Sequence, residues 1–231
     1  MKIIVVGGVA GGATAAARLR RLDEKAQITV YERGEYISFA NCGLPYHIGD
    51  VIQDRERLLL ETPETFKEKN NVTVKVKSNI VKINREKKTV LVKDLITSRE
   101  YEDSYDYLVL SPGAEPIKPS ISGIDSPNIF TLRNINDMDK IIKYSEEHKI
   151  KKVAVIGAGF IGLEAAENFL HKGKNVTIIE MGAQVLSPID FEMASLLHSH
   201  ITDKGVELIL KDGVEKFSYN GELTKIHLKS S

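Results

Sequence analysis

The chain has 231 residues, of which 42% are hydrophobic and 28% charged, and it contains one cysteine. These values are ordinary for a folded globular protein and exclude disordered, collagen-like and disulfide-stabilised chains. The 32 basic side chains are balanced by 32 acidic ones, so the chain lacks the positive excess that is typical of nucleic-acid-binding proteins. We therefore expect no nucleic-acid partner, and no metal site is indicated.

The first long uncharged stretch of the chain runs from Ile3 to Ala17. Its 15 residues fall short of the ~20 that a membrane-spanning helix needs. Glycines interrupt it, and Arg18, Arg20 and Arg21 follow it without the cleavage site of a signal peptide. The stretch is predicted to form a strand, a turn and a helix, so we expect a cytoplasmic protein with no membrane partner.

Two segments of the chain follow the same plan, and Gly157 of the second copy lies 150 residues after Gly7 of the first. In each copy a short apolar run meets glycines, and a helical stretch and a second β-rich run follow. The helical stretches are predicted at 13–22 and 163–170, and the second runs end in Glu32 and Glu180. Each copy therefore predicts a βαβ unit.

The second copy carries the complete dinucleotide-binding fingerprint, in which Gly157, Gly159 and Gly162 enclose Ala158 and the pair Phe160–Ile161. The first glycine permits the tight turn, the second lets the backbone approach a pyrophosphate, and the third packs the helix on the strand. Free N–H groups at the helix start bind the phosphates. Glu180, 23 residues after Gly157, is placed to accept hydrogen bonds from a ribose. This combination predicts a dinucleotide-binding site.

The first copy departs from the fingerprint, because Val9 stands where the second glycine is expected. Glu32 still closes the unit. A βαβ unit that binds nothing is the alternative at this point, and the presence of two such units in one chain argues against it.

Other helices and strands are indicated between and after the two copies. Thr62 and Pro63 predict the N-cap and first residue of a helix. Prolines between 112 and 119 indicate a linker. The remaining expected elements are strands at 72–76, 80–84, 89–93 and 105–110, helices at 135–148 and 191–204, and short strands from there to Ser231.

The only cysteine, Cys42, lies ten residues after Glu32, in the run 38–46. Asn41 is a favourable N-cap, so Cys42 is expected in the first turn of a short helix, where the helix dipole favours the nucleophilic thiolate. The alternative is a buried structural cysteine. The neighbouring Asn41 and Gly43, and the position just after a nucleotide-binding unit, favour a reactive thiol.

Taken together, these motifs resemble the N-terminal part of the pyridine nucleotide–disulfide oxidoreductases, and the resemblance covers essentially the whole chain. The run 38–46 resembles the branch that uses a single cysteine. Within it, the runs 7–14 and 20–23 resemble the coenzyme A–disulfide reductase group. That family tolerates Val9. Its NADH peroxidases and oxidases carry a histidine where this chain has Ala10, which makes peroxide chemistry less favoured.

The resemblance implies an α/β fold with two Rossmann-like three-layer dinucleotide-binding domains, the second inserted into the first. Residues 1–115 are expected to form the N-terminal part of an FAD-binding domain. Residues 116–231 are expected to form an NAD(P)H-binding domain that is incomplete at its C-terminus.

Site residues follow from the resemblance, position by position. Cys42 is the redox-active nucleophile. The residues expected at FAD are Gly7, Ala10, Gly11, Glu32, Arg33, Ile80, Ser111, Gly113 and Arg133. The residues expected at coenzyme A are Thr14, Arg18, Arg21, Ser38 and Asn41. NADH, with NADPH as the alternative, is expected at Gly157, Gly159, Phe160, Ile161, Gly162 and Glu180.

The implied reaction is the NAD(P)H-dependent reduction of coenzyme A disulfide through Cys42. Within the same family the alternatives are reduction of a coenzyme A persulfide or polysulfide, and an NADH oxidase. The alternative that involves no enzyme is a thiol redox sensor. Family members continue into a C-terminal domain that forms a homodimer, so the chain is expected to be a fragment, inactive by itself, of such a dimer.

Overall fold

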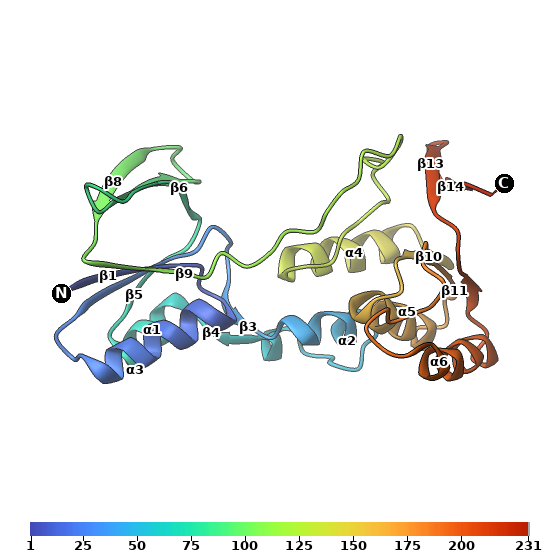
Figure 1. Cartoon of the computed structure of the whole chain (residues 1–231), viewed down its shortest axis with the longest axis horizontal. Helices are drawn as coiled ribbons and strands as arrows, with labels where there is room; N and C mark the ends of the chain where they lie inside the picture. Colours follow the sequence, from blue (N-terminus) through green and yellow to red (C-terminus); the bar gives the residue numbers. More distant parts are fainter. Residues whose placement is uncertain (231) are drawn as a thin grey trace. The chain divides into compact units, whose positions relative to one another are not determined.

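The computed structural model describes residues 1–230 and divides the chain into two compact units. The first unit comprises Met1–Ala40 and Glu56–Ala114, and the second comprises Asn41–Arg55 and the chain from Glu115 onward. The segment Asn41–Arg55, which contains Cys42, therefore packs with the second unit although it interrupts the sequence of the first. Figure 1 labels the helices and most of the strands.

The elements of the first unit are β1 (Lys2–Val6), α1 (Ala10–Leu22), β2 (Gln27–Tyr31), β3 (Ile37–Phe39), β4 (Leu59–Glu61), α3 (Pro63–Asn70), β5 (Thr73–Lys75), β6 (Ser78–Asn84), β7 (Thr89–Asp94), β8 (Glu100–Ser104) and β9 (Tyr107–Leu110). A 3-10 helix, Arg55–Leu58, precedes β4.

The elements of the second unit are a 3-10 helix (Asn41–Gly43), α2 (Leu44–Ile48), α4 (Ile135–Glu147), β10 (Lys152–Ile156), α5 (Phe160–His171), β11 (Asn175–Ile179), α6 (Phe191–Asp203), β12 (Glu207–Ile209), β13 (Val214–Tyr219) and β14 (Thr224–Leu228).

A four-stranded parallel sheet in the order β5-β2-β1-β9 forms the centre of the first unit. Helix α1 connects β1 to β2 and packs against both (Figure 1). Its buried face consists of small residues, Gly12, Ala13 and Ala16, so the helix approaches the apolar side chains of the sheet closely. The first predicted βαβ unit is thereby confirmed.

An antiparallel sheet, β6-β7-β8, forms a second layer of the first unit. Val90 and Val92 of β7 are buried against Ile4 and Tyr31 of the parallel sheet. A polar cluster lies beside this core: Asp103 of β8 accepts hydrogen bonds from Lys2 and from the Tyr31 hydroxyl, the latter at 2.7 Å. Burial and the hydrogen bond to Asp103 raise the pKa of Tyr31 above its usual value.

The start of α3 follows its sequence signal. Thr62 accepts a hydrogen bond from the backbone N–H of Thr65 at 3.2 Å, and the Thr65 hydroxyl accepts one from the Thr62 N–H at 2.9 Å. Pro63 occupies the first turn, where a missing N–H costs no hydrogen bond. The predicted N-cap is confirmed.

The second unit contains a three-stranded parallel sheet in the order β10-β11-β12. Helix α5 connects β10 to β11 and contacts both strands (Figure 1), so the second βαβ unit is confirmed. Helices α2 and α4 pack with each other, and α2 also packs with α5. Near the C-terminus β13 and β14 form an antiparallel hairpin, and Ser231, up to which short strands were expected, lies outside the described residues.

Several expected boundaries differ from the structure. Helices α1 and α5 begin at Ala10 and Phe160, three residues before the alanine-rich segments that predicted them. Strands β3, β4 and β8 were not predicted, because two have three residues each and β8 is rich in charged side chains. Within residues 1–230, no helix has the length and hydrophobicity to cross a membrane.

Candidate functional site

Backbone atoms of neighbouring residues crowd the glycine turn of the first unit. Gly7 has φ +94, and a Cβ there would lie 2.0 Å from the carbonyl oxygen of Ser111. A Cβ on Gly12 would lie 1.8 Å from the Gly7 carbonyl oxygen. Both positions therefore admit only glycine, and Gly12 brings α1 against β1 as the third fingerprint glycine does. Val9 serves as the N-cap of α1 without a side-chain hydrogen bond.

The turn of the second unit has the same geometry with more open surroundings. Gly157 has φ +97, and a Cβ on Gly162 would lie 2.0 Å from the Gly157 carbonyl oxygen. By contrast, a Cβ on Gly157 or Gly159 would meet nothing within 4 Å. The space in front of Gly159 is the place that a pyrophosphate would occupy. Phe160 and Ile161 next to it are 63% and 61% exposed.

A carboxylate supports each turn in the same way. Glu32 accepts hydrogen bonds from the N–H of Gly8 at 2.7 Å and of Gly34 at 2.6 Å. Glu180 accepts hydrogen bonds from Ala158 at 2.8 Å and from Gly182 at 2.6 Å. Each carboxylate oxygen keeps acceptor capacity after one such bond, so both groups can still accept from a ribose hydroxyl. The residues at both turns therefore fit a dinucleotide.

The structure brings several of the predicted FAD residues together at the first turn. Gly7 lies against Ser111, and a Cβ on Gly11 would lie 3.2 Å from the Ser111 hydroxyl. Gly113 has φ +71, which suits glycine in the coil that follows β9. Ile80 of β6 packs against the core cluster that contains Tyr31. Ala10 begins α1, Arg33 follows Glu32, and Arg133 belongs to the second unit.

The structure corrects the expected helix start at the cysteine. Asn41 and Cys42 lie in a 3-10 turn, and α2 begins at Leu44 with Gly43 as its N-cap and no side-chain cap. Pro45 explains the difference, since a residue without an N–H suits the first turn of an α-helix. Cys42 is exposed, so a buried structural role for it is wrong.

Four of the five residues expected at coenzyme A lie on one face of α1 or in β3, and the fifth, Asn41, belongs to the second unit. Thr14, Arg18 and Arg21 are all exposed at helical spacing on α1. Ser38 in β3 has φ +45, a conformation that costs energy for a residue other than glycine. Its N–H donates to the Gly8 carbonyl at 3.0 Å, so Ser38 is held beside the first turn. Arg20 is different, because its guanidinium donates to five backbone carbonyls.

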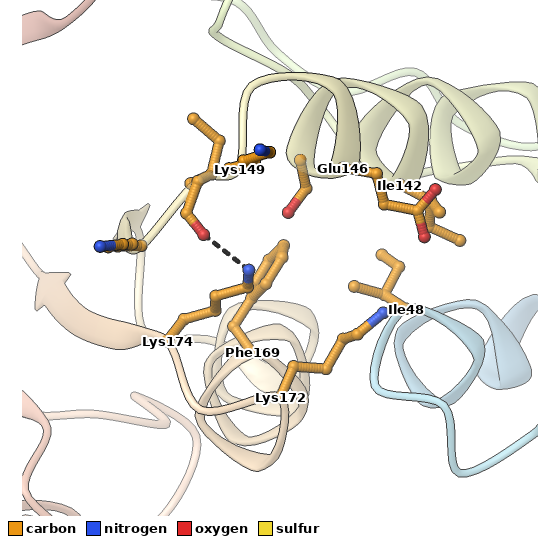
Figure 2. A pocket seen from close by; sticks show the side chains of 10 residues that line it. Ile48, Ile142, Glu146, Lys149, Phe169, Lys172 and Lys174 are labelled. Atoms are coloured by element: carbon orange, nitrogen blue, oxygen red, sulfur yellow. Dashed lines mark hydrogen bonds between the residues drawn. The ribbon is translucent and has the colours of Figure 1, made fainter.

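A cavity of about 480 Å³ lies between α2, α4 and α5 in the second unit (Figure 2). Ile48, Ile142 and Phe169 contribute apolar walls, and Lys174 donates to the Ile150 carbonyl at 2.6 Å. None of the predicted site residues lines this cavity. The cavity is therefore a feature apart from the predicted site.

Three residues of the cysteine segment that make long-range contacts were not predicted from the sequence. Gly49, Asp50 and Arg55 follow Cys42 in the chain and contact α5 and α4 through hydrogen bonds and ion pairs. No periodic pattern or motif marks these residues, because their partners lie more than 80 positions away in the sequence.

The fold and the two turns are typical of proteins that bind dinucleotides. Residues 1–231 match the family model described as pyridine nucleotide-disulphide oxidoreductase, and the chain belongs to this family.

Particular members are similar over nearly the whole chain. A coenzyme A disulfide reductase of Staphylococcus haemolyticus is 42% identical over 213 residues, which are 92% of this chain and 48% of that protein. The chain thus spans about half the length of this relative. The crystal structure of reduced Bacillus anthracis CoADR-RHD superposes with a TM-score of 0.96 at 52% identity, over 99% of this chain and 41% of that one. An NAD-dependent persulfide reductase from A. fulgidus gives a TM-score of 0.95 at 38% identity, over 100% of this chain and 43% of that one.

Proposed function

We propose that the chain forms the nucleotide-binding part of an oxidoreductase that reduces coenzyme A disulfide with NAD(P)H, through FAD and Cys42. The observation that carries the proposal is the exposed cysteine of a chain with two glycine turns of equal geometry, each supported by a carboxylate. Two turns fit two nucleotides, and the exposed thiol supplies a nucleophile. The similarity to coenzyme A disulfide reductases supports the choice of substrate.

In this proposal, residues 1–115 bind FAD and residues 116–231 bind NADH, with the second domain inserted into the first. Glu32 and Glu180 each accept hydrogen bonds from a ribose, and Gly159 lets the pyrophosphate approach the start of α5. Phe160 and Ile161 cover the bound nucleotide. FAD, when bound, carries electrons from the nicotinamide to the sulfur centre. The complete protein forms a homodimer through a C-terminal domain.

The exposed face of α1 is proposed to hold coenzyme A. Within residues 1–230, Arg18 and Arg21 lack the backbone contacts that occupy Arg20, and guanidinium groups bind phosphates through paired N–H donors. Thr14 and Ser38 of the same unit add polar groups, and the family resemblance adds Asn41. Coenzyme A carries phosphates, so this face suits its nucleotide end.

The proposed chemistry is thiol–disulfide exchange. The Cys42 thiolate attacks one sulfur of the substrate, a Cys42–coenzyme A disulfide forms, and one coenzyme A thiolate leaves. Two electrons from NADH then reduce the mixed disulfide and release the second coenzyme A and the Cys42 thiolate. The net reaction converts NADH, a proton and coenzyme A disulfide into NAD⁺ and two coenzyme A thiols.

Cys42→Ser in the complete protein tests the proposal. We expect flavin reduction by NADH to continue and turnover of coenzyme A disulfide to stop, because serine cannot form the mixed disulfide. The measurements are stopped-flow flavin absorbance and steady-state NADH consumption. Disulfide turnover that survives in the variant would contradict the assignment of Cys42.

A persulfide reductase is the second candidate, and the structural similarity to the A. fulgidus enzyme favours it. Comparing kcat/KM for coenzyme A disulfide, coenzyme A persulfide and oxygen separates these activities from that of an oxidase. A redox sensor would consume one equivalent of NADH and stop.

A further inference from the structure

Gly49, at the end of α2, is a point of close approach between the cysteine segment and α5. Gly49 is buried, and its φ of −83 is open to any residue, so the backbone conformation does not require glycine. Space does require it: a Cβ would lie 2.2 Å from Oδ1 and 2.8 Å from Cβ of Asn168. Ordinary contacts begin at 3.4 Å, so a side chain here would push the two helices apart.

Asn168 is fixed in this contact. Its side chain is 1% exposed, and its Nδ2 donates to the Glu164 carbonyl at 2.8 Å within α5. Its Oδ1 faces Gly49 and has no hydrogen-bond partner in the described chain. A buried acceptor without a partner costs free energy. The Asn168 side chain therefore fills the space that a side chain at position 49 would need.

Further contacts hold the same segment on both sides. Nδ1 of His171 lies 2.9 Å from the Gly49 carbonyl oxygen and carries the proton in this hydrogen bond. Lys172 pairs with Asp50 at 2.9 Å. At the other end of the segment Arg55 binds Asp139 of α4 through two hydrogen bonds of 2.9 and 2.8 Å. Figure 2 shows Ile48 of α2 and Lys172, the residue after α5, at the cavity that these helices border.

The geometry connects Cys42 to the second dinucleotide turn. One residue, Gly43, separates Cys42 from the start of α2, and Gly49 directly follows α2. Helix α5 begins beside Gly159 of the dinucleotide turn and ends at His171. The helix that starts at the turn therefore supports, with its last turn, the segment that carries the thiol.

We propose that Gly49, Asn168 and His171 are positioning residues that set the location of Cys42 for attack on the disulfide. This inference rests on the proposed function, because it assumes that Cys42 is the nucleophile. The contact acts through backbone placement and touches neither substrate nor nucleotide. Loss of the contact should affect the sulfur step and spare hydride transfer from NADH.

Gly49→Ala is the principal test, and Gly213→Ala is its control. The nearest atoms to a Cβ on Gly213 would belong to the Lys229 side chain, at 3.5 Å, an ordinary contact in the same unit. In the complete protein we expect Gly49→Ala to lower kcat for coenzyme A disulfide by about 10- to 100-fold, the effect of a displacement of roughly 1 Å. Flavin reduction by NADH and KM for NADH should stay within about twofold.

A compensating variant provides the rescue. Asn168→Gly removes the three Asn168 atoms that a Cβ at position 49 would strike, including the Cβ at 2.8 Å that alanine would keep, so Gly49→Ala/Asn168→Gly should recover kcat to within about threefold of the wild type. Equal loss of flavin reduction and disulfide turnover in Gly49→Ala, or no recovery in the double variant, would overturn the inference. Should Gly49→Ala not fold, His171→Ala removes one hydrogen bond and should lower the same kcat by about 2- to 10-fold; an unchanged kcat would overturn the inference.

Alkylation of the 231-residue chain separates this inference from the proposed function. Cys42 is the only cysteine, so the rate of reaction with iodoacetamide reports on it alone. We expect Gly49→Ala to change this rate at least about threefold and the double variant to restore it. An unchanged rate overturns the positioning role. If the complete wild-type protein does not turn over coenzyme A disulfide, the proposed function fails, whereas the alkylation result still decides whether Gly49 positions Cys42.

Discussion

The two glycine turns are alike in their internal geometry and differ in what surrounds them. Gly7 and Gly157 have φ values of +94 and +97, and a carboxylate binds the next residue's N–H in both copies. Strand β1 lies between β2 and β9, whereas β10 pairs only with β11 in the described sheet. Ser111 closes over Gly7, and open space lies beside Gly157. The same local device is therefore embedded in one unit and exposed in the other.

This contrast means that equivalent substitutions should have different consequences. Substitutions at the embedded first turn should lower the free energy of unfolding, because neighbouring backbone atoms cannot move away. Substitutions at the exposed second turn should lower the affinity for the nucleotide, because the adjoining space is left for a ligand.

The largest effect is expected for Gly12→Ala. Its Cβ would lie 1.8 Å from the Gly7 carbonyl oxygen, and overpacking against backbone should lower the free energy of unfolding by about 3 kcal/mol. Urea denaturation followed by circular dichroism measures the loss. Gly11→Ala is the matched control, since its nearest neighbour is the Ser111 hydroxyl at 3.2 Å, and its loss should be smaller. Equal stability of wild type and Gly12→Ala would contradict the tight packing of α1 on β1.

The second effect concerns the choice of NADH over NADPH. A 2′-phosphate would meet the Glu180 carboxylate, and Met181, Gly182, Ala183 and Gln184 after it offer no positive charge. We expect a preference for NADH of roughly 10- to 200-fold in kcat/KM, or about 1–3 kcal/mol. Glu180→Gln should reduce this ratio while keeping an acceptor for the turn.

Glu32→Gln is the comparison for that measurement, because it alters the carboxylate of the other turn. It should leave the ratio of the two coenzymes unchanged. Equal use of NADH and NADPH by the wild type would show that Glu180 does not contact the ribose.

Gly159→Ala tests the open surroundings of the second turn through its affinity for NADH. A Cβ there meets nothing within 4 Å, so the free energy of unfolding should change by less than about 1 kcal/mol. The methyl group would occupy the space of the pyrophosphate, and the Kd for NADH should rise about tenfold or more. Titration calorimetry and urea denaturation of the same variant measure the two quantities. A loss of stability without a loss of affinity would contradict the open geometry of the second turn.

The smallest effect is expected at the start of β1, the end opposite the glycine turn, where Lys2 pairs with Asp103. Burial would raise the pKa of Asp103, but hydrogen bonds from Lys2 and Tyr31 outweigh it and lower the pKa below its usual value. A lowered pKa in the folded state means that the contribution to stability is present above about pH 4 and is lost as the pH falls through the folded-state pKa. Asp103→Asn should therefore cost about 1 kcal/mol at pH 7, and the difference from the wild type should vanish in acid.

Lys2→Met should reproduce part of this loss, whereas Lys152→Met at the equivalent, exposed position of β10 should not. Urea denaturation at several pH values measures all three variants. If the difference in the free energy of unfolding between Asp103→Asn and wild type did not depend on pH, the charge of Asp103 would not be its cause.

Sequence alone determined the two βαβ units, the fingerprint at Gly157–Gly162 and the helix start at Thr62. These features depend on contacts within a few residues or on the regular spacing of apolar side chains, so short-range physics suffices to predict them. The family resemblance also identified Cys42 and the residues at each turn, and their roles stay predictions.

Only the tertiary structure decided what surrounds these local features. The turn at Gly7 is closed by Ser111, more than 100 residues later, and Asn41–Arg55 packs on α4 and α5. The need for glycine at position 49 depends on Asn168, and its φ of −83 gives no local reason for it. Such contacts join residues distant in sequence, whose meeting depends on how whole helices and sheets pack, and no local pattern encodes that packing.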